Sequence, residues 1–346
     1  MRRALVFCAC VAGIMEGFTS VHAQGTSNFF TDKTIRVIVS YPPGGGYDLL
    51  ARNLARSMPK HIPGQPTMVV QNMPGAGSRL AAGYVYNVAP QDGTVMATVS
   101  QYLPLAQLMD NETNFDSGKF QWIGNLGQGG NNVMAAWHET GVKTIDDVKW
   151  RELLVGSTGP QTNTEYYPAV LNNLFETKFR LIRGYSGFPQ TLLAIERGEL
   201  EGSSSADWPG WKAIRPYWLQ ERKVNIILQI GSTREKELPD VPLLNDLARN
   251  DEERQILDLI TSGVDIGRPF MAGPKVPQDR IRLLRDAFDK LIIDEDFLTT
   301  IKKQNLEISP MSGIELQKLV ERTTNAPKSI VDKTRAALTI TTATKK

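Results

Sequence analysis

The feature that most constrains the fold is an alternation of short apolar strands, glycine-rich loops and amphipathic segments. Residues 35–40 are typical of a buried strand, and the loop that follows contains three consecutive glycines. Residues 48–58 then place leucines at helical spacing. Further strands are expected at 67–71 and 94–100, with a helix at 78–88 between them. Because parallel neighbours need a helical crossover, this βαβαβ order predicts an α/β domain with a doubly wound sheet.

A second unit of the same kind follows the first. We expect strands at 132–137, 153–156, 179–183, 200–204 and 224–229, helices from 164 and 188, and later amphipathic helices at 281–293 and 314–323. The pattern predicts two similar α/β lobes joined by a hinge. Lobe 1 is expected to comprise residues 24–124 plus 225–346, and lobe 2 residues 125–224. The Thr- and Lys-rich tail is expected to fray from Lys333.

The N-terminus has the layout of a secretory signal peptide. Arg2 and Arg3 precede an apolar stretch at 4–15, and a small-residue site ends at Ala23, where we expect cleavage and thus a signal peptide of residues 1–23. The apolar stretch is shorter than the ~20 residues of a membrane-spanning helix. Both cysteines of the chain, Cys8 and Cys10, lie in this segment. The exported protein would therefore use no disulfide, thiolate nucleophile or cysteine-bound metal.

Charge and motifs argue against several function classes. The 39 Lys+Arg and 37 Asp+Glu residues give a net charge of +2, without the basic runs of nucleic-acid-binding proteins. The segment at 75–80 lacks the third glycine of a dinucleotide fingerprint, and neither a phosphate-binding Gly-Lys-Ser/Thr nor a Gly-x-Ser-x-Gly elbow occurs. After residue 23 the only histidines are His61 and His138. We therefore expect no catalytic residues, no metal and no cofactor, and keep an exported α/β hydrolase as the alternative.

Glycine- and hydroxyl-rich loops follow three of the expected strands. They span residues 41–48, 73–78 and 155–164, and each precedes an expected helix. Glycine lets the backbone approach a ligand, and free N–H groups at a helix start favour anions. Each loop could also be an ordinary turn. Their repetition favours a shared anion site, because ligands of open α/β sheets bind outside the carboxyl ends of the strands.

Residues 35–48, 69–78 and 89–93 closely resemble the Bug-type receptors, the periplasmic solute-binding proteins of tripartite tricarboxylate transporters. The resemblance extends through the segments at 156–159, 184–187, 197–199 and 238–243. It implies a type II-like periplasmic-binding-protein (Venus flytrap) fold, a carboxylate ligand held between the lobes and delivery to inner-membrane transporter subunits. A periplasmic monomer without catalytic activity is expected. A liganded receptor that signals to a sensor protein is the alternative output.

The resemblance, together with the loops and strand ends that surround its motifs, gives a set of expected ligand-binding residues. They are Tyr41, Pro43, Gly44, Gly45, Gly46, Tyr47, Asp48, Gly75, Ala76, Gly77, Ser78, Gln101, Ser157, Thr158, Thr162, Tyr185 and Asp207. Backbone N–H groups of the first loop would hold a carboxylate, while Asp48 caps its helix, orders a water or accepts from a ligand donor. Ser78 is a candidate N-cap. The hydroxyls of Ser157 and Thr162 would donate to a distal carboxylate.

Bulky and basic residues near these loops leave the ligand class open. Tyr47 replaces a small hydroxyl residue of the family, and Trp208 and Trp211 follow the second-lobe strands. These rings could form a stacking wall, which makes an aromatic carboxylate as reasonable as a di- or tricarboxylate, or the tryptophans could fill the core of lobe 2. Arg79, Arg183 and Arg268 lie near these loops and could contact the ligand, but arginines of this kind more often pair with surface acids.

Overall fold

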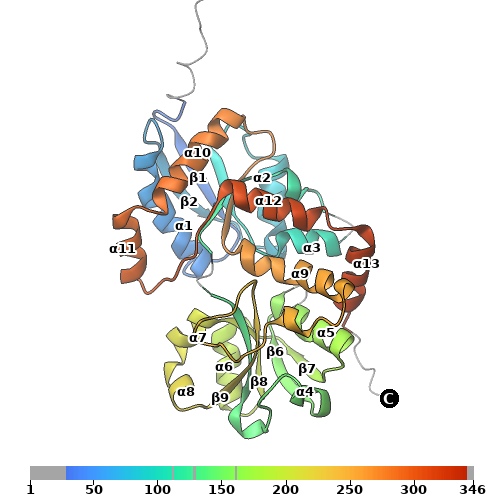
Figure 1. Cartoon of the computed structure of the whole chain (residues 1–346). Helices are drawn as coiled ribbons and strands as arrows, with labels where there is room; N and C mark the ends of the chain where they lie inside the picture. The colour runs from blue at the N-terminus through green and yellow to red at the C-terminus, as the bar shows by residue number, and fades with distance from the viewer. Residues whose placement is uncertain (1–28, 111–112, 128–129, 160–161, 341–346) are drawn as a thin grey trace, which may run out of the picture.

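The computed structural model describes residues 29–110, 113–127, 130–159 and 162–340. Two lobes, each built on a mixed β-sheet with helices on its faces, lie one above the other in Figure 1. The predicted two-lobed α/β fold is thus confirmed. The signal peptide expected at residues 1–23 and Pro160 and Gln161 of the lobe 2 loop lie outside the described residues. None of the described helices is long and apolar enough to cross a membrane.

Lobe 1 contains a six-stranded sheet in the order β11-β4-β10-β3-β1-β2. Its strands are β1 (Thr34–Val39), β2 (Thr67–Asn72), β3 (Val95–Thr98), β4 (Gln121–Asn125), β10 (Pro269–Ala272) and β11 (Met311–Ser312). β1 pairs in parallel with β2 and β3, as the βαβαβ pattern predicts, whereas β10 runs antiparallel to β3 and β4. The helices are α1 (Gly46–Ser57), α2 (Arg79–Asn87), α3 (Leu103–Met109), α10 (Gln278–Leu291), α11 (Glu295–Lys303) and α12 (Gly313–Thr324).

Lobe 2 contains a five-stranded sheet in the order β7-β6-β8-β5-β9. Its strands are β5 (Asn132–Trp137), β6 (Leu153–Ser157), β7 (Phe179–Arg183), β8 (Gly202–Asp207) and β9 (Val224–Ile230). Its helices are α4 (Asp147–Trp150), α5 (Asn163–Phe175), α6 (Phe188–Glu196), α7 (Trp208–Ile214) and α8 (Pro216–Gln220). β6 pairs in parallel with β7 and β8, and β5 runs antiparallel to β8 and β9. The predicted strands at 132–137 and 179–183 have these same bounds.

The second predicted lobe boundary falls one strand too early. β9 pairs with β5 in the sheet of lobe 2, although the boundary at residue 225 assigned this strand to lobe 1. The chain leaves the second sheet only after Ile230. Hydrophobicity alone could not place this strand, because an antiparallel edge strand of either sheet has the same apolar pattern.

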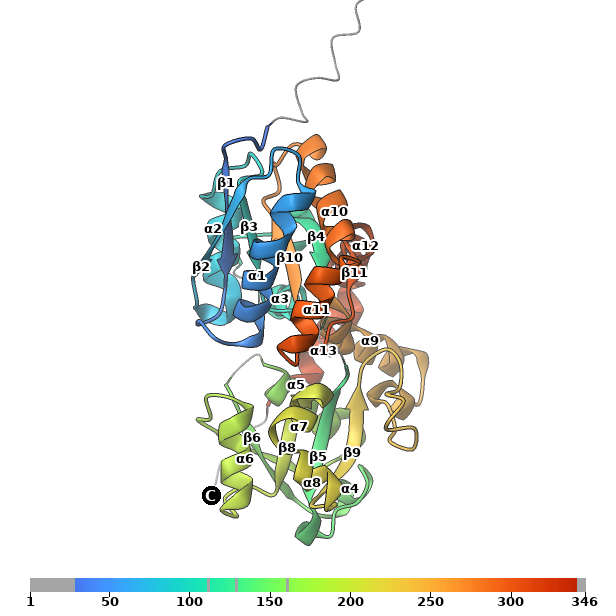
Figure 2. The same cartoon turned by 90° about the vertical axis from the view of Figure 1, so that its left-hand side faces the viewer.

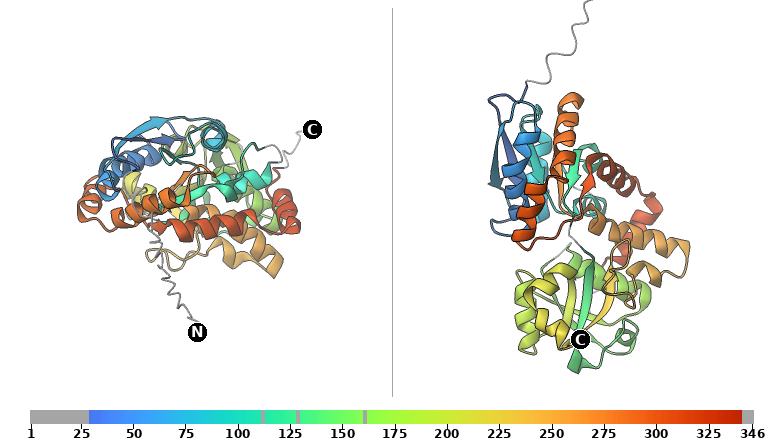
Figure 3. Two further views of the ribbon diagram at one scale, coloured as in Figure 1. Left: turned by 90° about the horizontal axis from the view of Figure 1, so that it is seen from above. Right: turned by 60° about the vertical axis from the view of Figure 1, so that its left-hand side comes forward.

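The C-terminal segment is helical where we expected fraying. Among the helices that the sequence patterns missed, α9 (Asp251–Ile266) and α13 (Lys328–Ala337) pack against each other beside the junction of the lobes, as Figures 2 and 3 show. Val331 and Thr334 of α13 are buried. The predicted fraying from Lys333 is therefore wrong for the residues up to Ala337. Tertiary contacts stabilise this helix, although its sequence alone gives little indication of one.

A single hydrophobic cluster runs from lobe 1 into lobe 2 through this junction. It joins Tyr102 and Leu105 of lobe 1 with Tyr167 of α5 and Ile260 of α9. The hydroxyl oxygens of Tyr102 and Tyr167 lie 2.6 Å apart, and Asn132 donates to both at 3.1 and 3.3 Å. Burial raises the pKa of Tyr167 to about 12. The lobes therefore meet through a packed, hydrogen-bonded core at one side.

Candidate functional site

A cavity of about 630 Å³ lies between the two lobes. Lobe 1 contributes Tyr41, Tyr47, Ala76, Gly77, Arg79, Ser100, Gln101, Tyr102, Ala106 and Arg268, and lobe 2 contributes Thr158, Thr162, Asn163 and Asp207. Most of these residues follow the carboxyl ends of β1, β3 and β6 or end β8. This is the location expected for the ligand of an α/β protein, and the volume suits a small molecule.

The glycine loop of lobe 1 is organised by a buried carboxylate. Asp48, in the first turn of α1, is 2% exposed and accepts from the Gly44 N–H at 2.9 Å. It also accepts from Arg52 at 2.8 and 2.9 Å and from Asn72 at 2.8 Å. The hydrogen bond from Arg52 lowers the pKa of Asp48 to about 2. Asp48 therefore holds the loop in place, and its carboxylate does not line the cavity.

The glycines of this loop stand at the edge of the cavity. Pro43, Gly44 and Gly45 are exposed, and neither they nor Gly46 line the cavity. Gly44 has a φ of +89°, a conformation that favours glycine. A side chain at Gly46 would come within 3.2 Å of the Arg268 guanidinium. The predicted carboxylate cradle at this loop thus remains a prediction, and the structure gives Gly46 a different role as a neighbour of Arg268.

Stacked tyrosines form an aromatic wall in lobe 1. The rings of Tyr41 and Tyr47 lie 4.2 Å apart between centroids with an interplanar angle of 22°. The Tyr47 hydroxyl donates to the Gln101 side chain at 3.3 Å and accepts from the Gln101 N–H at 3.2 Å. Burial raises the pKa of Tyr47 well above its usual value. The structure therefore brings three predicted site residues together on one wall.

The second glycine loop reaches the cavity only in part. Gly75, Ala76, Gly77 and Ser78 all have positive φ, and Ala76 and Gly77 line the cavity. Ser78 is buried, its Oγ lies 2.7 Å from that of Ser40, and it accepts from the Ser100 N–H at 2.9 Å. Ser78 is the N-cap residue of α2, but its side chain makes no cap hydrogen bond, because its hydroxyl ties β1 to the end of β3 instead.

In lobe 2 a second buried carboxylate, that of Glu165, accepts the hydrogen bond of Ser157, the hydroxyl that was predicted to donate to a ligand. Ser157 is fully buried, donates to Glu165 at 2.7 Å and accepts from the Gly159 N–H at 3.0 Å. Glu165 also accepts from Arg183 at 2.7 and 3.0 Å. Burial would raise the pKa of Glu165, but these hydrogen bonds outweigh it and lower the pKa. Ser157 therefore does not line the cavity, and its hydroxyl proton is already used.

The threonines of the same loop do face the cavity. Thr158 and Thr162 line it, and their hydroxyls form a cluster with Thr164, with the Thr162 and Thr164 oxygens 2.7 Å apart. Thr162 can also donate to the Gly159 carbonyl at 2.7 Å. Rotation of these hydroxyls lets the cluster offer either a donor or an acceptor to a ligand.

The tryptophans belong to the core of lobe 2. Trp211 is fully buried with its ring 4.9 Å from that of Phe188, and Trp208 is 7% exposed in the same cluster. Neither lines the cavity, so the stacking wall considered for them is wrong and the core interpretation holds. Tyr185 packs at the edge of this cluster and does not line the cavity either. Asp207 does line it, and accepts from the Gly210 N–H at 3.2 Å.

The three candidate arginines differ in their partners. Arg183 is bound to Glu165, and Arg79 lies 3.3 Å from Asp110. Arg268 forms no ion pair within the part of the chain that the structure describes, and its Nη1 donates to the Gly127 carbonyl at 3.4 Å. Arg79 and Arg268 line the cavity but were considered only as candidate arginines, and the list of expected ligand-binding residues also omitted Ser100, Tyr102, Ala106 and Asn163. Their signal was weak because each lies in or beside a predicted loop or strand end without a motif of its own.

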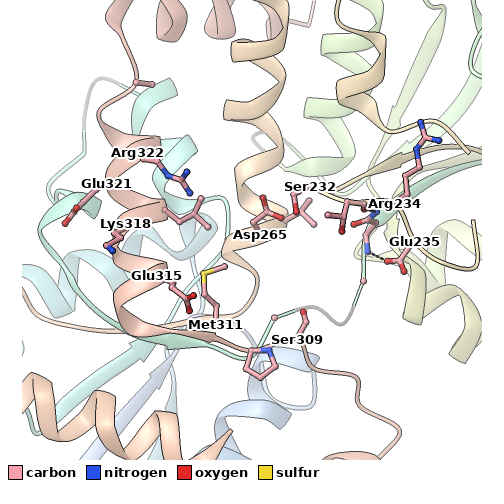
Figure 4. Close-up of a pocket in the computed structure, with 18 of the residues that line it drawn as sticks. Ser232, Arg234, Glu235, Asp265, Ser309, Met311, Glu315, Lys318, Glu321 and Arg322 are labelled. Carbon is pink, nitrogen blue, oxygen red and sulfur yellow. Dashed lines mark hydrogen bonds between the residues drawn. The ribbon is translucent and has the colours of Figure 1, made fainter. Parts of the chain in front are cut away.

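A larger cavity, about 1330 Å³, lies beside the connections between the lobes. Figure 4 shows Glu315, Lys318 and Arg322 projecting from α12 toward it, with Asp265 at the end of α9. Burial raises the pKa of Asp265. No predicted ligand-binding residue lines this cavity, and its charges have both signs. We therefore take the smaller interlobe cavity as the candidate ligand site.

Two α/β lobes with a cavity at facing strand ends are the architecture of the two-lobed solute-binding proteins. Residues 50–335 match the model of the tripartite tricarboxylate transporter family receptor. The chain belongs to this family, which confirms the resemblance drawn from the glycine-rich loops. Members of the family are solute-binding receptors, a class without enzymatic activity.

Relatives support this membership over nearly the whole chain. The "UPF0065 protein in gbd 5'region" of Cupriavidus necator is 28% identical over 326 residues, 92% of each chain. A TctC solute-binding protein from Polaromonas has a TM-score of 0.65 at 20% identity, covering 87% of this chain and 98% of its own. MatC from Rhodopseudomonas palustris, solved with bound malate, has a TM-score of 0.62 at 20% identity, covering 86% and 99%. At this identity the structures show a shared fold.

Proposed function

We propose that the protein is a periplasmic solute-binding protein that captures a small carboxylate between its lobes and delivers it to a membrane tripartite tricarboxylate transporter. The observation that carries this proposal is the interlobe cavity, to which both lobes contribute polar groups. A ligand that contacts both walls stabilises the closed arrangement, because it interacts with lobe 2 only when the lobes are close together.

The chemistry of the cavity supports a carboxylate. Arg268 provides a cation on lobe 1, and the lobe 2 threonines provide hydroxyl donors. The malate bound to MatC shows that a protein of this fold can hold a carboxylate. The signal peptide expected at residues 1–23 supports a periplasmic location.

Ligand-induced thermal stabilisation tests this function. We expect the melting temperature of the purified protein to rise with at least one compound from a panel of mono-, di- and tricarboxylates, since a ligand of the native state stabilises by mass action. Maltose and putrescine serve as a neutral and a cationic control. A rise with either control and with none of the carboxylates would refute the assignment.

Transport is tested separately in the host. Deletion of the gene should abolish uptake of the radiolabelled ligand identified by the thermal screen, and a plasmid copy should restore it. Unchanged uptake in the deletion strain would refute delivery to a transporter while leaving ligand binding in place.

A further inference from the structure

We propose that the cleft selects a monocarboxylate whose opposite end carries a hydroxyl or ammonium group, and that it disfavours di- and tricarboxylates. Arg268 on lobe 1 binds the single carboxylate, and Asp207 on lobe 2 accepts from the donor end. This inference rests on the proposed function and names the ligand class of the same site.

Arg268 is the cavity arginine with the least internal pairing. It follows Gly267 at the end of α9 and directly precedes β10, so its backbone is fixed by the lobe 1 sheet. Its Nε is buried without a hydrogen-bond partner, and among the described residues no acid lies within ion-pair distance of its guanidinium. A guanidinium with unused donors in a cavity is suited to a planar carboxylate, which it can bind with paired hydrogen bonds.

The surroundings of Arg268 position its guanidinium next to the aromatic wall. The guanidinium carbon lies 5.8 Å from the centroid of the Tyr47 ring, a cation–π distance. The absence of a side chain at Gly46 leaves room for the guanidinium. Tyr47 is in turn fixed by stacking on Tyr41 and by Gln101. The guanidinium is therefore held beside the tyrosine wall. The apolar part of a ligand whose carboxylate binds Arg268 would lie along the tyrosine rings.

The other basic groups near the cavity are already engaged. Arg183 is neutralised by Glu165 and does not line the cavity, and Arg79 lies against Asp110. The part of the cavity that lobe 2 lines contains Thr158, Thr162, Asn163 and Asp207, without a basic residue among them. One ligand carboxylate can thus be paired with a cation, and a second has none available in the described cavity wall.

Asp207 gives the lobe 2 side a negative charge. As the N-cap of α7 it accepts from the Gly210 N–H, and it is half-buried at the cavity. Its remaining acceptor capacity is suited to a hydroxyl or ammonium donor. A ligand carboxylate at this end would face a like charge in a partly desolvated site, which opposes binding. The cavity therefore has a positive end on lobe 1 and a negative end on lobe 2.

Matched ligands test this polarity by isothermal titration calorimetry. One pair is 5-aminopentanoate and adipate, which share the same tether and differ in one end group, and the other is 4-hydroxybenzoate and terephthalate. We expect the monocarboxylate of at least one pair to bind roughly ten-fold or more tightly than its dicarboxylate partner, and more tightly than citrate.

Two substitutions locate the charges. Arg268→Gln should weaken binding of the preferred monocarboxylate by about ten-fold or more. Asp207→Asn retains a good N-cap residue and should narrow or reverse the preference between the members of a pair. Arg180→Gln is the matched control, because Arg180 is an exposed lobe 2 arginine paired with Glu152, and it should leave all affinities unchanged.

The outcomes separate this inference from the proposed function. Tighter binding of dicarboxylates or citrate to the wild-type protein, or unchanged monocarboxylate affinity in Arg268→Gln, overturns the polarity while carboxylate binding stands. If none of the tested carboxylates binds, both the polarity of the cavity and the proposed carboxylate-binding function are overturned. If Arg268→Gln does not fold, as judged by circular dichroism, the Asp207→Asn variant decides: an unchanged ligand preference in that variant also refutes the proposal.

Discussion

The two loops that flank the ligand cavity are built on the same plan but present different groups to it. In lobe 1 the buried carboxylate of Asp48 binds Arg52 and the Gly44 N–H. In lobe 2 the buried carboxylate of Glu165 binds Arg183 and the Ser157 hydroxyl. Each acid lies in the first turn of the helix that follows its loop. A pair of a buried acid and an arginine thus holds each loop in place as its anchor, and neither acid lines the cavity.

The two acids differ in the loop group that donates a hydrogen bond to each of them. Asp48 uses a loop N–H, whereas Glu165 uses a side-chain hydroxyl and leaves the neighbouring threonines free to face the cavity. The comparison shows that the most family-like residues of both loops serve as scaffold. The cavity surface instead comes from residues beside them, including Tyr47 and Thr162.

The largest expected effect on stability comes from the lobe 2 anchor. Glu165→Gln removes the charge that pairs with Arg183 inside a buried site, and we expect a loss of about 2–3 kcal/mol in the free energy of unfolding, below the full value for a buried pair because Arg183 is half-exposed. Urea denaturation measures this loss. Glu152→Gln, at an exposed ion pair, is the control and should change stability by less than about 0.5 kcal/mol. Equal effects of the two substitutions would contradict the anchor role.

The lobe 1 anchor should contribute somewhat less, and its contribution should depend on pH. Asp48→Asn is expected to cost about 1–2 kcal/mol at neutral pH, discounted because Arg52 is half-exposed. The native pKa of Asp48 is about 2, below the ordinary value of 3.8, so the stabilisation is complete above the higher value and is lost as the pH falls toward the lower one.

Unfolding of the wild-type protein and of Asp48→Asn over a pH series measures this dependence. The stability difference between them should shrink as the pH falls from about 5 to about 2. A difference that stays constant over this range would show that the Asp48 charge does not stabilise the loop.

Neighbouring glycines of the first loop give the smallest effects and separate backbone strain from contact with Arg268. Gly44→Ala forces a side chain into a positive-φ position with open space around it, so we expect a loss of about 1 kcal/mol in stability and little change in ligand affinity. Gly46→Ala instead crowds the Arg268 guanidinium, so affinity should fall about two- to five-fold with a smaller stability loss. Thermal unfolding measures the stability of both variants, and calorimetric titration measures their ligand affinity. Equal changes in stability and affinity in the two variants would contradict the separate roles of Gly44 and Gly46.

Local patterns predicted most of the regular elements. Strands such as β5 and β7 and helices such as α5 were identified because their apolar residues repeat at the period of the structure they form. β10 was missed since it has four residues and begins with proline, too short for any period to show. α13 was misjudged because its stability comes from packing on α9 and α5.

The candidate site was predicted at the level of loops and only partly at the level of side chains. Tyr47, Gln101 and Thr162 were predicted and line the cavity. Ser78 and Ser157 were predicted and are buried behind it. A serine hydroxyl that binds a ligand and one that binds an internal carboxylate look alike in sequence, because the difference depends on a partner elsewhere in the chain, such as Glu165.

The sequence by itself determined the two-lobed α/β class, the family and the loops at the strand ends, because these depend on local periodicity and on contiguous glycine motifs. The tertiary structure decided which side chains face the cavity and which charges remain unpaired. Arg183 and Arg268 cannot be distinguished as isolated residues. Folding neutralises Arg183 with Glu165 and leaves Arg268 at the cavity without such a partner among the described residues, because ion pairing is set by distances across elements far apart in the chain.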